Sequence, residues 1–127
     1  MYQEAIKVFE QYQEDLEHEP AMIGLRLFLG EDGGLVWRNK AQREHYEREG
    51  IIAATTLPWV GVAKMFTKCE LVSLKQAYRA AFASDDVVRK VISFYANGQS
   101  HRLDVEFLAV YGNIEAGVIM TRQQSLI

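Results

Sequence analysis

The chain has 127 residues, 49% of them hydrophobic and 24% charged, and its 14 basic and 17 acidic residues give a net charge of −3. This size and apolar content suit one folded domain over residues 1–127 and exclude wholesale disorder. No stretch keeps one hydrophobic period for long, which excludes a collagen-like or coiled-coil rod, and the slight excess of acid argues against a strong, non-specific grip on nucleic acid.

Two features of the sequence indicate where the protein works. No basic segment followed by an apolar stretch opens the chain, and no run approaches the ~18 apolar residues of a membrane span. The single cysteine, Cys69, cannot close an intrachain disulfide, and a lone thiol fits a reducing compartment. The sequence therefore predicts a soluble, cytoplasmic protein that does not contact a membrane.

The first predicted element is an amphipathic helix. Its apolar side chains recur at helical spacing and are Tyr2, Ala5, Ile6, Phe9, Tyr12 and Leu16. Pro20 limits the helix, because the residue before a proline avoids the helical region. A hairpin follows, with residues 25–29 and 35–38 as strands around a glycine-rich turn at 30–34. A short buried helix from Pro20 to Gly30 is the competing interpretation, and we prefer the hairpin.

A second helix is predicted to begin after Asn39 and to end at Gly50. Asn39 is a favourable N-cap, and Gln42, three residues later, completes a capping-box pattern. This helix is polar nearly all round, and only Ala41 and Tyr46 suit a packed interior. Ion pairs at four-residue spacing would stabilise it by about 1–2 kcal/mol in all, through Lys40–Glu44, Arg43–Glu47, Glu44–Arg48 and His45–Glu49. We therefore expect the helix on the outside of the domain or covered by a partner.

The middle of the chain is predicted to form two strands and a third helix. Residues 51–56 and 60–66 suit strands that are separated at Pro58, which confines the junction to a sheet edge or a bend. Thr67 and Glu70 form a capping box that begins the helix. The apolar stripe of this helix consists of Leu71, Leu74, Tyr78, Ala81 and Phe82.

A fourth helix is predicted after Ser84. The serine hydroxyl and the two aspartates that follow it suit a helix start, and Asn97 and Gly98 suit its end. The buried face of this helix would consist of Val88, Val91, Ile92 and Tyr95.

The C-terminal segment has the clearest strand pattern. Apolar and charged residues alternate through 103–107, and Gly112 and Asn113 turn the chain into a returning strand at 114–121. Together the elements predict an α+β fold, a mainly antiparallel β-sheet packed against three or four helices.

Cys69 is the one residue with a specific chemical argument. The expected cap at Thr67 places the thiol in the first turn of a helix, where unpaired N–H groups favour the thiolate. It points away from the predicted apolar stripe, so solvent can reach it. No Cys-x-x-Cys pair or nearby histidine accompanies it, and most such thiols are inert. Cys69 is therefore a candidate and not a predicted catalytic residue.

No other pattern predicts catalysis, a cofactor or a metal. His45 and Glu49 have the spacing at which two helical side chains share a metal, but two ligands do not complete a site. The carboxylates at 14–19 belong to a solvated helix end, with no apolar pocket to raise a pKa. Phosphate-binding loops, a nucleophile elbow and a zinc-protease motif are absent from the sequence. We expect no cofactor and no metal, and an enzyme is the less favoured class.

One stretch mixes aromatic and basic residues as contact surfaces often do. It consists of Trp37, Arg38, Lys40, Arg43, His45, Tyr46 and Arg48. Aromatic residues and arginine are enriched at protein–protein contacts, and the interleaved glutamates weaken the field that nucleic acid needs. The alternative is that Trp37 packs in the core while the charges solvate an exposed helix.

Three hypotheses for function follow. We favour a small non-enzymatic interaction protein, an adaptor, inhibitor or immunity-type binder, that acts on a protein partner through this mixed-charge helix. The second is a small-ligand-binding protein or enzyme with a pocket near Trp59, where a curved sheet under two helices can enclose one, and with a role for the Cys69 thiol. The third is a weak nucleic-acid binder. A homodimer is also allowed, because the C-terminal hairpin can leave a strand edge for a second copy.

Overall fold

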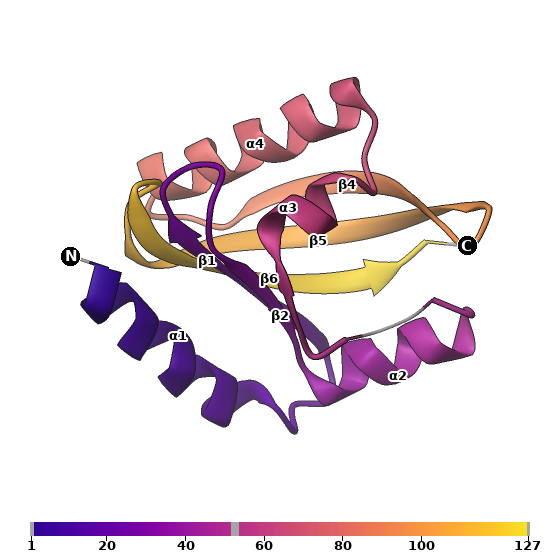
Figure 1. Ribbon diagram of the computed structural model, residues 1–127, viewed down its shortest axis with the longest axis horizontal. Helices are drawn as coiled ribbons and strands as arrows, with labels where there is room; N and C mark the ends of the chain where they lie inside the picture. The colour runs from indigo at the N-terminus through magenta and orange to yellow at the C-terminus, as the bar shows by residue number, and fades with distance from the viewer. Residues whose placement is uncertain (1, 52–53, 127) are drawn as a thin grey trace.

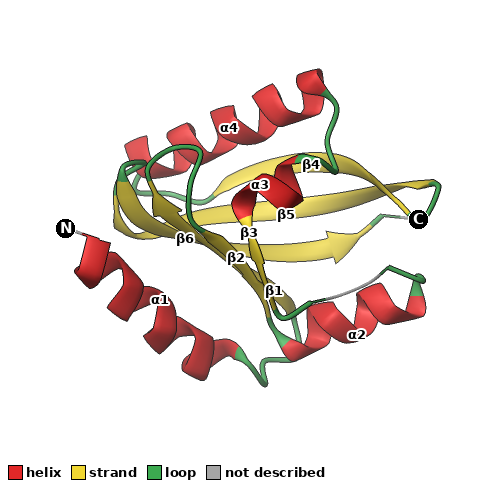
Figure 2. Ribbon diagram, viewed as in Figure 1, coloured by secondary structure: helices red, strands yellow, loops and turns green. Residues whose placement is uncertain are grey.

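The computed structural model describes residues 2–51 and 54–126, and within them six strands form one antiparallel sheet in the order β3-β2-β1-β6-β5-β4. The strands are β1 Met22–Leu29, β2 Leu35–Arg38, β3 Thr56–Pro58, β4 Val88–Ala96, β5 Gln99–Gly112 and β6 Ala116–Ser125. The helices are α1 Tyr2–Leu16, α2 Lys40–Arg48, α3 Trp59–Ala63 and α4 Lys68–Ala83 (Figure 2). This confirms the predicted fold class, a mainly antiparallel sheet packed against helices.

Helices cover both faces of the sheet, with α1 and α4 on opposite sides (Figure 1). Because β1 is enclosed on both faces, residues 23–28 are all buried, and alternate side chains enter different layers. Leu25 and Leu27 pack with Phe9 of α1, whereas Phe28 belongs to the larger cluster under α4. The molecule therefore has two separate cores, one on each side of the sheet.

The first helix and the first hairpin form as predicted. Helix α1 buries Ala5 and Phe9, and β1 and β2 pair antiparallel from Gly24 opposite Arg38 to Leu27 opposite Leu35. Gly34, which has φ +100°, ends the turn between these strands, and a Cβ there would collide with the Leu27 carbonyl oxygen. The competing helix from Pro20 to Gly30 is therefore wrong.

Helix α2 begins as predicted, but it is not a free-standing outer helix. The Asn39 side chain accepts a hydrogen bond from the Gln42 backbone N–H at 3.1 Å, whereas the Gln42 side chain turns inward and does not complete a capping box. Among the described residues, Lys40–Glu44 is the one predicted ion pair that forms, at 3.9 Å. Gln42 and Tyr46 are buried, and they attach the helix to the inner face of the sheet.

The predicted strand at 60–66 is wrong, because this segment contains helix α3 and the turn after it. Pro58 ends β3 and is the N-cap of α3, and Trp59 and Val62, three residues apart, point into the core. Of the predicted strand at 51–56, residues 52–53 lie outside the described residues, and the described part enters the sheet only at Thr56.

The predicted helix after Ser84 is also wrong, because residues 88–96 form strand β4. The Ser84 hydroxyl accepts a hydrogen bond from the Asp86 N–H in a local turn rather than starting a helix. Burial alternates along the strand, so Ile92 is buried while Val91 and Tyr95 are exposed. The apolar residues at this point are largely β-branched, which favours an extended chain.

The C-terminal hairpin forms as predicted, but it does not leave the expected free edge. Strand β6 pairs with β5 on one side and with β1 on the other, so it lies inside the sheet. The edges of the described sheet are β3 and β4. Within the described ranges, no helix combines the length and the apolar content that crossing a lipid bilayer requires.

Candidate ligand-binding site

A row of residues across the sheet forms the floor of a cavity. Arg38, Gly24 and Thr121 are neighbours in register on β2, β1 and β6. Gly24 has no side chain, and a Cβ placed there would lie 2.9 Å from Thr121 Oγ1, 3.2 Å from Gln123 Nε2 and 3.3 Å from Gln42 Oε1. Three polar atoms therefore converge over this glycine, and a larger residue would occupy their space.

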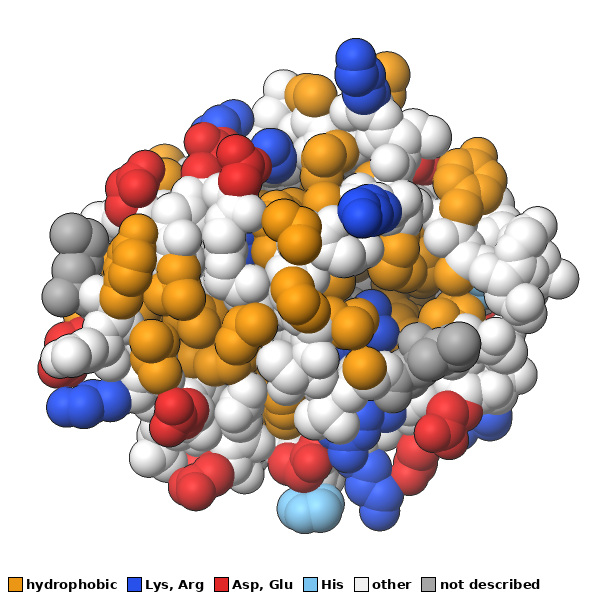
Figure 3. Space-filling model, in the orientation of Figure 1, with side chains coloured by type: hydrophobic (Ala, Val, Ile, Leu, Met, Phe, Trp, Pro, Cys, Tyr) orange, Lys and Arg blue, Asp and Glu red, His pale blue; other side chains and the backbone are white. Residues whose placement is uncertain are grey.

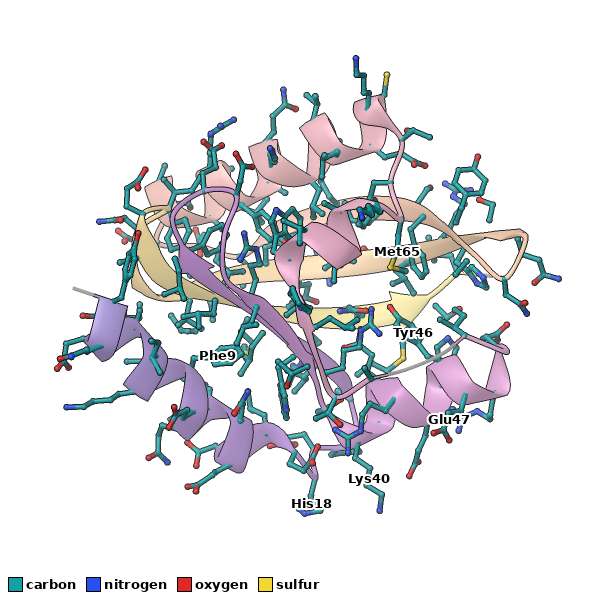
Figure 4. All side chains as sticks on the ribbon, viewed as in Figure 1. Phe9, His18, Lys40, Tyr46, Glu47 and Met65 are labelled. Atoms are coloured by element: carbon teal, nitrogen blue, oxygen red, sulfur yellow. The ribbon has the colours of Figure 1, made fainter. Side chains whose placement is uncertain are left out.

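The cavity has a volume of about 90 Å³ and lies between this floor and the helices on the same face. Most of its walls are apolar and are formed by Val36, Val62, Met65, Phe66, Leu74, Tyr78, Ile92, Phe94, Leu103, Val105 and Phe107. Figure 4 shows Tyr46, from α2, and Met65, which follows α3, reaching into the same region beside the sheet. Figure 3 shows apolar side chains gathered around α3 in the middle of this view, with most charged side chains toward the rim.

A wider surface hollow of about 480 Å³ adjoins the cavity. The two share Tyr46, Phe94 and Leu103 as lining residues.

One end of the cavity is polar because two amide side chains meet there. Gln42 Nε2 donates to Gln123 Oε1 at 2.8 Å and to the Tyr46 hydroxyl at 3.2 Å, and Gln123 Nε2 donates to Thr121 Oγ1 at 3.0 Å. The carbonyl oxygen of the Gln42 side chain, Oε1, is buried and has no hydrogen-bond donor among residues 2–51 and 54–126. A buried acceptor without a partner costs about 1–3 kcal/mol, so this atom is suited to a donor from a ligand or a water.

Arg38 places a buried cation at the same end. Arg38 is only 4% exposed, and its guanidinium lies over the Tyr46 ring, 4.8 Å from the ring centroid. Among residues 2–51 and 54–126, no carboxylate pairs with it and its side chain makes no hydrogen bond. Burial lowers the pKa of Arg38, and the neighbouring Tyr46 hydroxyl partly opposes that effect.

The second arginine in the lining, Arg26, is held differently. Its guanidinium lies between the rings of Phe28 and Trp59, at 4.2 and 4.3 Å from their centroids. It donates to the backbone carbonyls of Gly33 at 2.6 Å and Glu31 at 3.1 Å, which ties the 30–34 turn to the sheet. Burial lowers its pKa to about 10. Arg26 is therefore a structural residue whose two terminal nitrogens are already bonded to the turn, although its buried Nε has no acceptor among the described residues.

The predicted contact surface is not continuous. Trp37, Arg38 and Tyr46 are each less than 5% exposed, which contradicts a surface role for these three residues. Trp37 packs in the core under α1, whereas Arg38 and Tyr46 line the cavity on the opposite face. Period-two alternation along β2 explains the difference, because adjacent residues on a strand point to opposite faces.

The other predicted contact residues have different environments. The Arg43 guanidinium donates to the Glu17 carboxylate at 2.8 Å and to the Arg38 carbonyl oxygen at 2.7 Å, so it joins α2 to the end of α1. Lys40 is exposed and points away from the sheet, as His18 and Glu47 also do (Figure 4). For Lys40, His45 and Arg48, contact with a partner stays a prediction.

The predicted pocket residues Trp59 and Cys69 have different relations to the cavity. Trp59 is 2% exposed and supports the cavity from behind, through its contacts with Arg26 and Tyr78. Cys69 is exposed in the first turn of α4 and does not line the cavity. A pocket near Trp59 is therefore present, but the thiol is not part of it.

Sequence reasoning missed the residues that form the polar end of the cavity. The sequence predicts a capping role for Gln42 and no role for Gly24, Thr121 or Gln123. A glycine inside a strand often marks a close approach of other groups, and this was the available signal. The other three are ordinary polar residues, and only the sheet register brings them together.

The sequence matches no model of a protein family and no curated protein. Solved structures, however, share its fold. A LOV protein from Rhodobacter sphaeroides is 16% identical, with a TM-score of 0.63 over 95% of this chain and 68% of that chain. The PAS domain of an HTR-like protein from Haloarcula marismortui is 12% identical, with a TM-score of 0.53 over 98% and 96%. A sensory box histidine kinase/response regulator from Burkholderia thailandensis is 8% identical, with a TM-score of 0.57 over 91% and 84%.

These likenesses show the fold, which is that of PAS and LOV domains. They also overturn the favoured functional hypothesis, an interaction protein that acts through the mixed-charge helix. Domains of this fold are named as LOV and sensory proteins, and α2 uses its few inward residues to line a cavity. The second hypothesis was a small-ligand-binding protein or enzyme with a pocket near Trp59 and a role for the Cys69 thiol. Its ligand-binding part agrees better with these findings.

Proposed function

We propose that this chain is a sensory domain that binds a small ligand in the cavity between the inner face of the sheet and helices α2, α3 and α4. The observation that carries the proposal is the cavity itself, which has apolar walls and converging polar groups at one end. Small-molecule sites usually combine an apolar lining with a few placed polar groups. The buried, unpartnered Gln42 Oε1 supports a ligand that supplies a donor.

The sheet has packed side chains on both faces, which supports transmission of ligand binding from the cavity face to the face covered by α1. Gly24 and Thr121 face the cavity, and their strand neighbours Leu25 and Met120 pack in the layer beneath α1. A ligand that binds one arrangement of β1 and β6 more tightly shifts the population toward that arrangement. We propose that the packing of α1 reports such a shift on the opposite face.

Filling the cavity tests this function. Gly24→Val adds a side chain where three polar atoms converge, so it should abolish binding without changing any charge. Screening small molecules by thermal denaturation should find compounds that raise the melting temperature of the wild type by several degrees and leave Gly24→Val unchanged, since only the form that binds is stabilised.

Gly61→Ala is the matched control, because a Cβ at Gly61 meets no atom within 4 Å. It should respond to the same compounds as the wild type does. The proposal fails if compounds that stabilise the wild type stabilise Gly24→Val equally.

Self-association and location stay predictions within this proposal. A second copy would use the edge strand β4, where Val91 and Tyr95 are exposed, and not the C-terminal hairpin. Sedimentation of the wild type and of Tyr95→Glu would show whether a dimer forms and whether this edge mediates it. The single free thiol of Cys69 supports a cytoplasmic location.

A further inference from the structure

The charges that line the cavity are unbalanced. The lining contains two arginines, Arg26 and Arg38, and no aspartate or glutamate among the described residues. Buried cations in proteins are normally paired, because moving a charge out of water is costly unless an opposite charge compensates. The lining is therefore complementary to an anion.

Among the described residues, Arg38 has more donors available for that anion than Arg26, whose one donor without an acceptor is Nε. The Arg26 guanidinium nitrogens Nη1 and Nη2 donate to carbonyl oxygens of the 30–34 turn. The Arg38 guanidinium lies over the Tyr46 ring, and within the described ranges it has neither a carboxylate nor a hydrogen-bond acceptor. A planar guanidinium presents paired N–H donors that match the two oxygens of a carboxylate.

The acceptor Gln42 Oε1, which lies near Arg38, restricts the chemistry of the ligand further. Gly24 is the register partner of Arg38, and Gln42 Oε1 would lie 3.3 Å from a Cβ at Gly24. Within the described part of the chain this oxygen is buried without a donor, and a carboxylate alone offers none. A ligand that satisfies both groups therefore carries an anionic end and, close to it, a hydrogen-bond donor.

A hydroxyl is a better donor here than an ammonium group. An ammonium would bring a third positive charge beside Arg26 and Arg38, with no acidic lining residue to offset it. The volume of about 90 Å³ and the apolar walls suit a short aliphatic remainder.

We propose that the ligand of this cavity is a small hydroxycarboxylate, whose carboxylate binds the Arg38 guanidinium and whose hydroxyl donates to Gln42 Oε1. This inference rests on the proposed function and specifies its ligand class. The short alkyl part lies against Val105, Phe107 and the other apolar wall residues.

Three matched compounds test it by titration calorimetry at constant ionic strength. The compounds are 2-hydroxybutanoate, butanoate, which lacks the hydroxyl, and 2-hydroxybutanamide, which lacks the charge. We expect 2-hydroxybutanoate to bind about 10–100-fold more tightly than either analogue, since hydrogen bonds to charged groups are worth about that factor and an unmet buried acceptor costs similarly.

Two variants locate the binding groups. Arg38→Met should remove the advantage of 2-hydroxybutanoate over 2-hydroxybutanamide, and Gln42→Leu should remove its advantage over butanoate. Arg48→Gln changes an exposed residue at the end of α2, the helix that contains Gln42. It should leave all three affinities unchanged. Because the two binding variants change different residues, either one suffices if the other does not fold.

The outcomes separate this inference from the proposed function. Equal binding of the acid and the amide, or of the acid and butanoate, overturns the hydroxycarboxylate. The same holds if none of the three binds while neutral compounds still stabilise the wild type but not Gly24→Val. If no compound of any kind distinguishes the wild type from Gly24→Val, the proposed function itself fails.

Discussion

Asn39 joins three segments that are far apart in the sequence, although its residue type predicted only a helix cap. Its Oδ1 accepts hydrogen bonds from the N–H groups of Ile23 and Gln42, both at 3.1 Å. Its Nδ2 donates to the carbonyl oxygens of Leu16 at 3.1 Å and Ala21 at 2.9 Å. The side chain is fully buried, so it holds the end of α1, the start of β1 and the start of α2 in one place.

Replacing Asn39 with alanine should therefore cost more than the loss of a cap. We expect Asn39→Ala to lower the free energy of unfolding by about 3 kcal/mol, because it leaves buried N–H and carbonyl groups without partners. Urea denaturation measures the change. The matched control is Thr67→Ala at the exposed capping box of α4, which should cost about 1 kcal/mol. Equal effects of the two changes would contradict the joining role of Asn39.

At the scale of elements, contacts between segments replace the pairs that the sequence suggested. Arg43 bonds to Glu17, which follows α1, and not to Glu47 on its own helix. The hydrogen bond from Arg43 is the main cause that lowers the pKa of the Glu17 carboxyl. A carboxyl with a lowered pKa in the folded state stabilises the fold above its ordinary pKa and loses that contribution as the pH falls through the folded value.

Glu17→Gln should therefore reduce the acid dependence of stability. Between pH 7 and pH 3, the free energy of unfolding of the wild type should fall more steeply than that of Glu17→Gln, since the variant has no carboxylate to protonate at this contact. Urea denaturation at a series of pH values measures both slopes. Glu10→Gln, at an exposed position of α1, is the control and should follow the wild type. Parallel curves for the wild type and Glu17→Gln would exclude this contribution.

The turn between β4 and β5 explains why this segment is a hairpin and not the end of a helix. Asn97 and Gly98 have φ values of 54° and 72°, the left-handed conformation that two-residue hairpin turns require. Gly98→Val should lower the free energy of unfolding by about 1–2 kcal/mol, because a side chain strains this conformation even though nothing lies within 4 Å of its Cβ.

Gly61→Ala also replaces a glycine, but at a position where a side chain does not strain the backbone. Gly61 lies in helix α3 with open space around a Cβ, so alanine should raise stability by up to about 1 kcal/mol. Thermal denaturation of both variants compares the two sites. A loss at Gly61 as large as that at Gly98 would mean that backbone conformation is not the cause.

At the scale of the whole molecule, the sheet separates two layers with different roles. The layer under α1 is closely filled by apolar residues such as Phe9, Leu27 and Trp37. The layer under α4 encloses the cavity and holds the polar groups that converge over Gly24. Because β1 and β6 contribute side chains to both layers, they form the physical connection between the cavity and α1.

Local patterns in the sequence determined the elements whose signals are strong over short distances. Helical spacing over 2–16, the capping box at Thr67 and the strand alternation over 103–107 all predicted the observed structure. Where the pattern was ambiguous, at 60–66 and 84–95, the local interpretation was wrong. Short apolar runs fit a helix or a strand equally well, and tertiary packing decides between them.

The sequence by itself determined the fold class, the α1 and α4 helices and the β1–β2 and β5–β6 hairpins, because periodicity and capping act within a few residues of one another. Only the tertiary structure decided the candidate site. Arg38, Gly24 and Thr121 are up to 97 positions apart and meet because β2, β1 and β6 pair in one register. That register depends on the packing of the whole sheet. The tertiary structure, and not the local sequence, therefore decides that the Arg38 side chain lines the cavity instead of facing a partner.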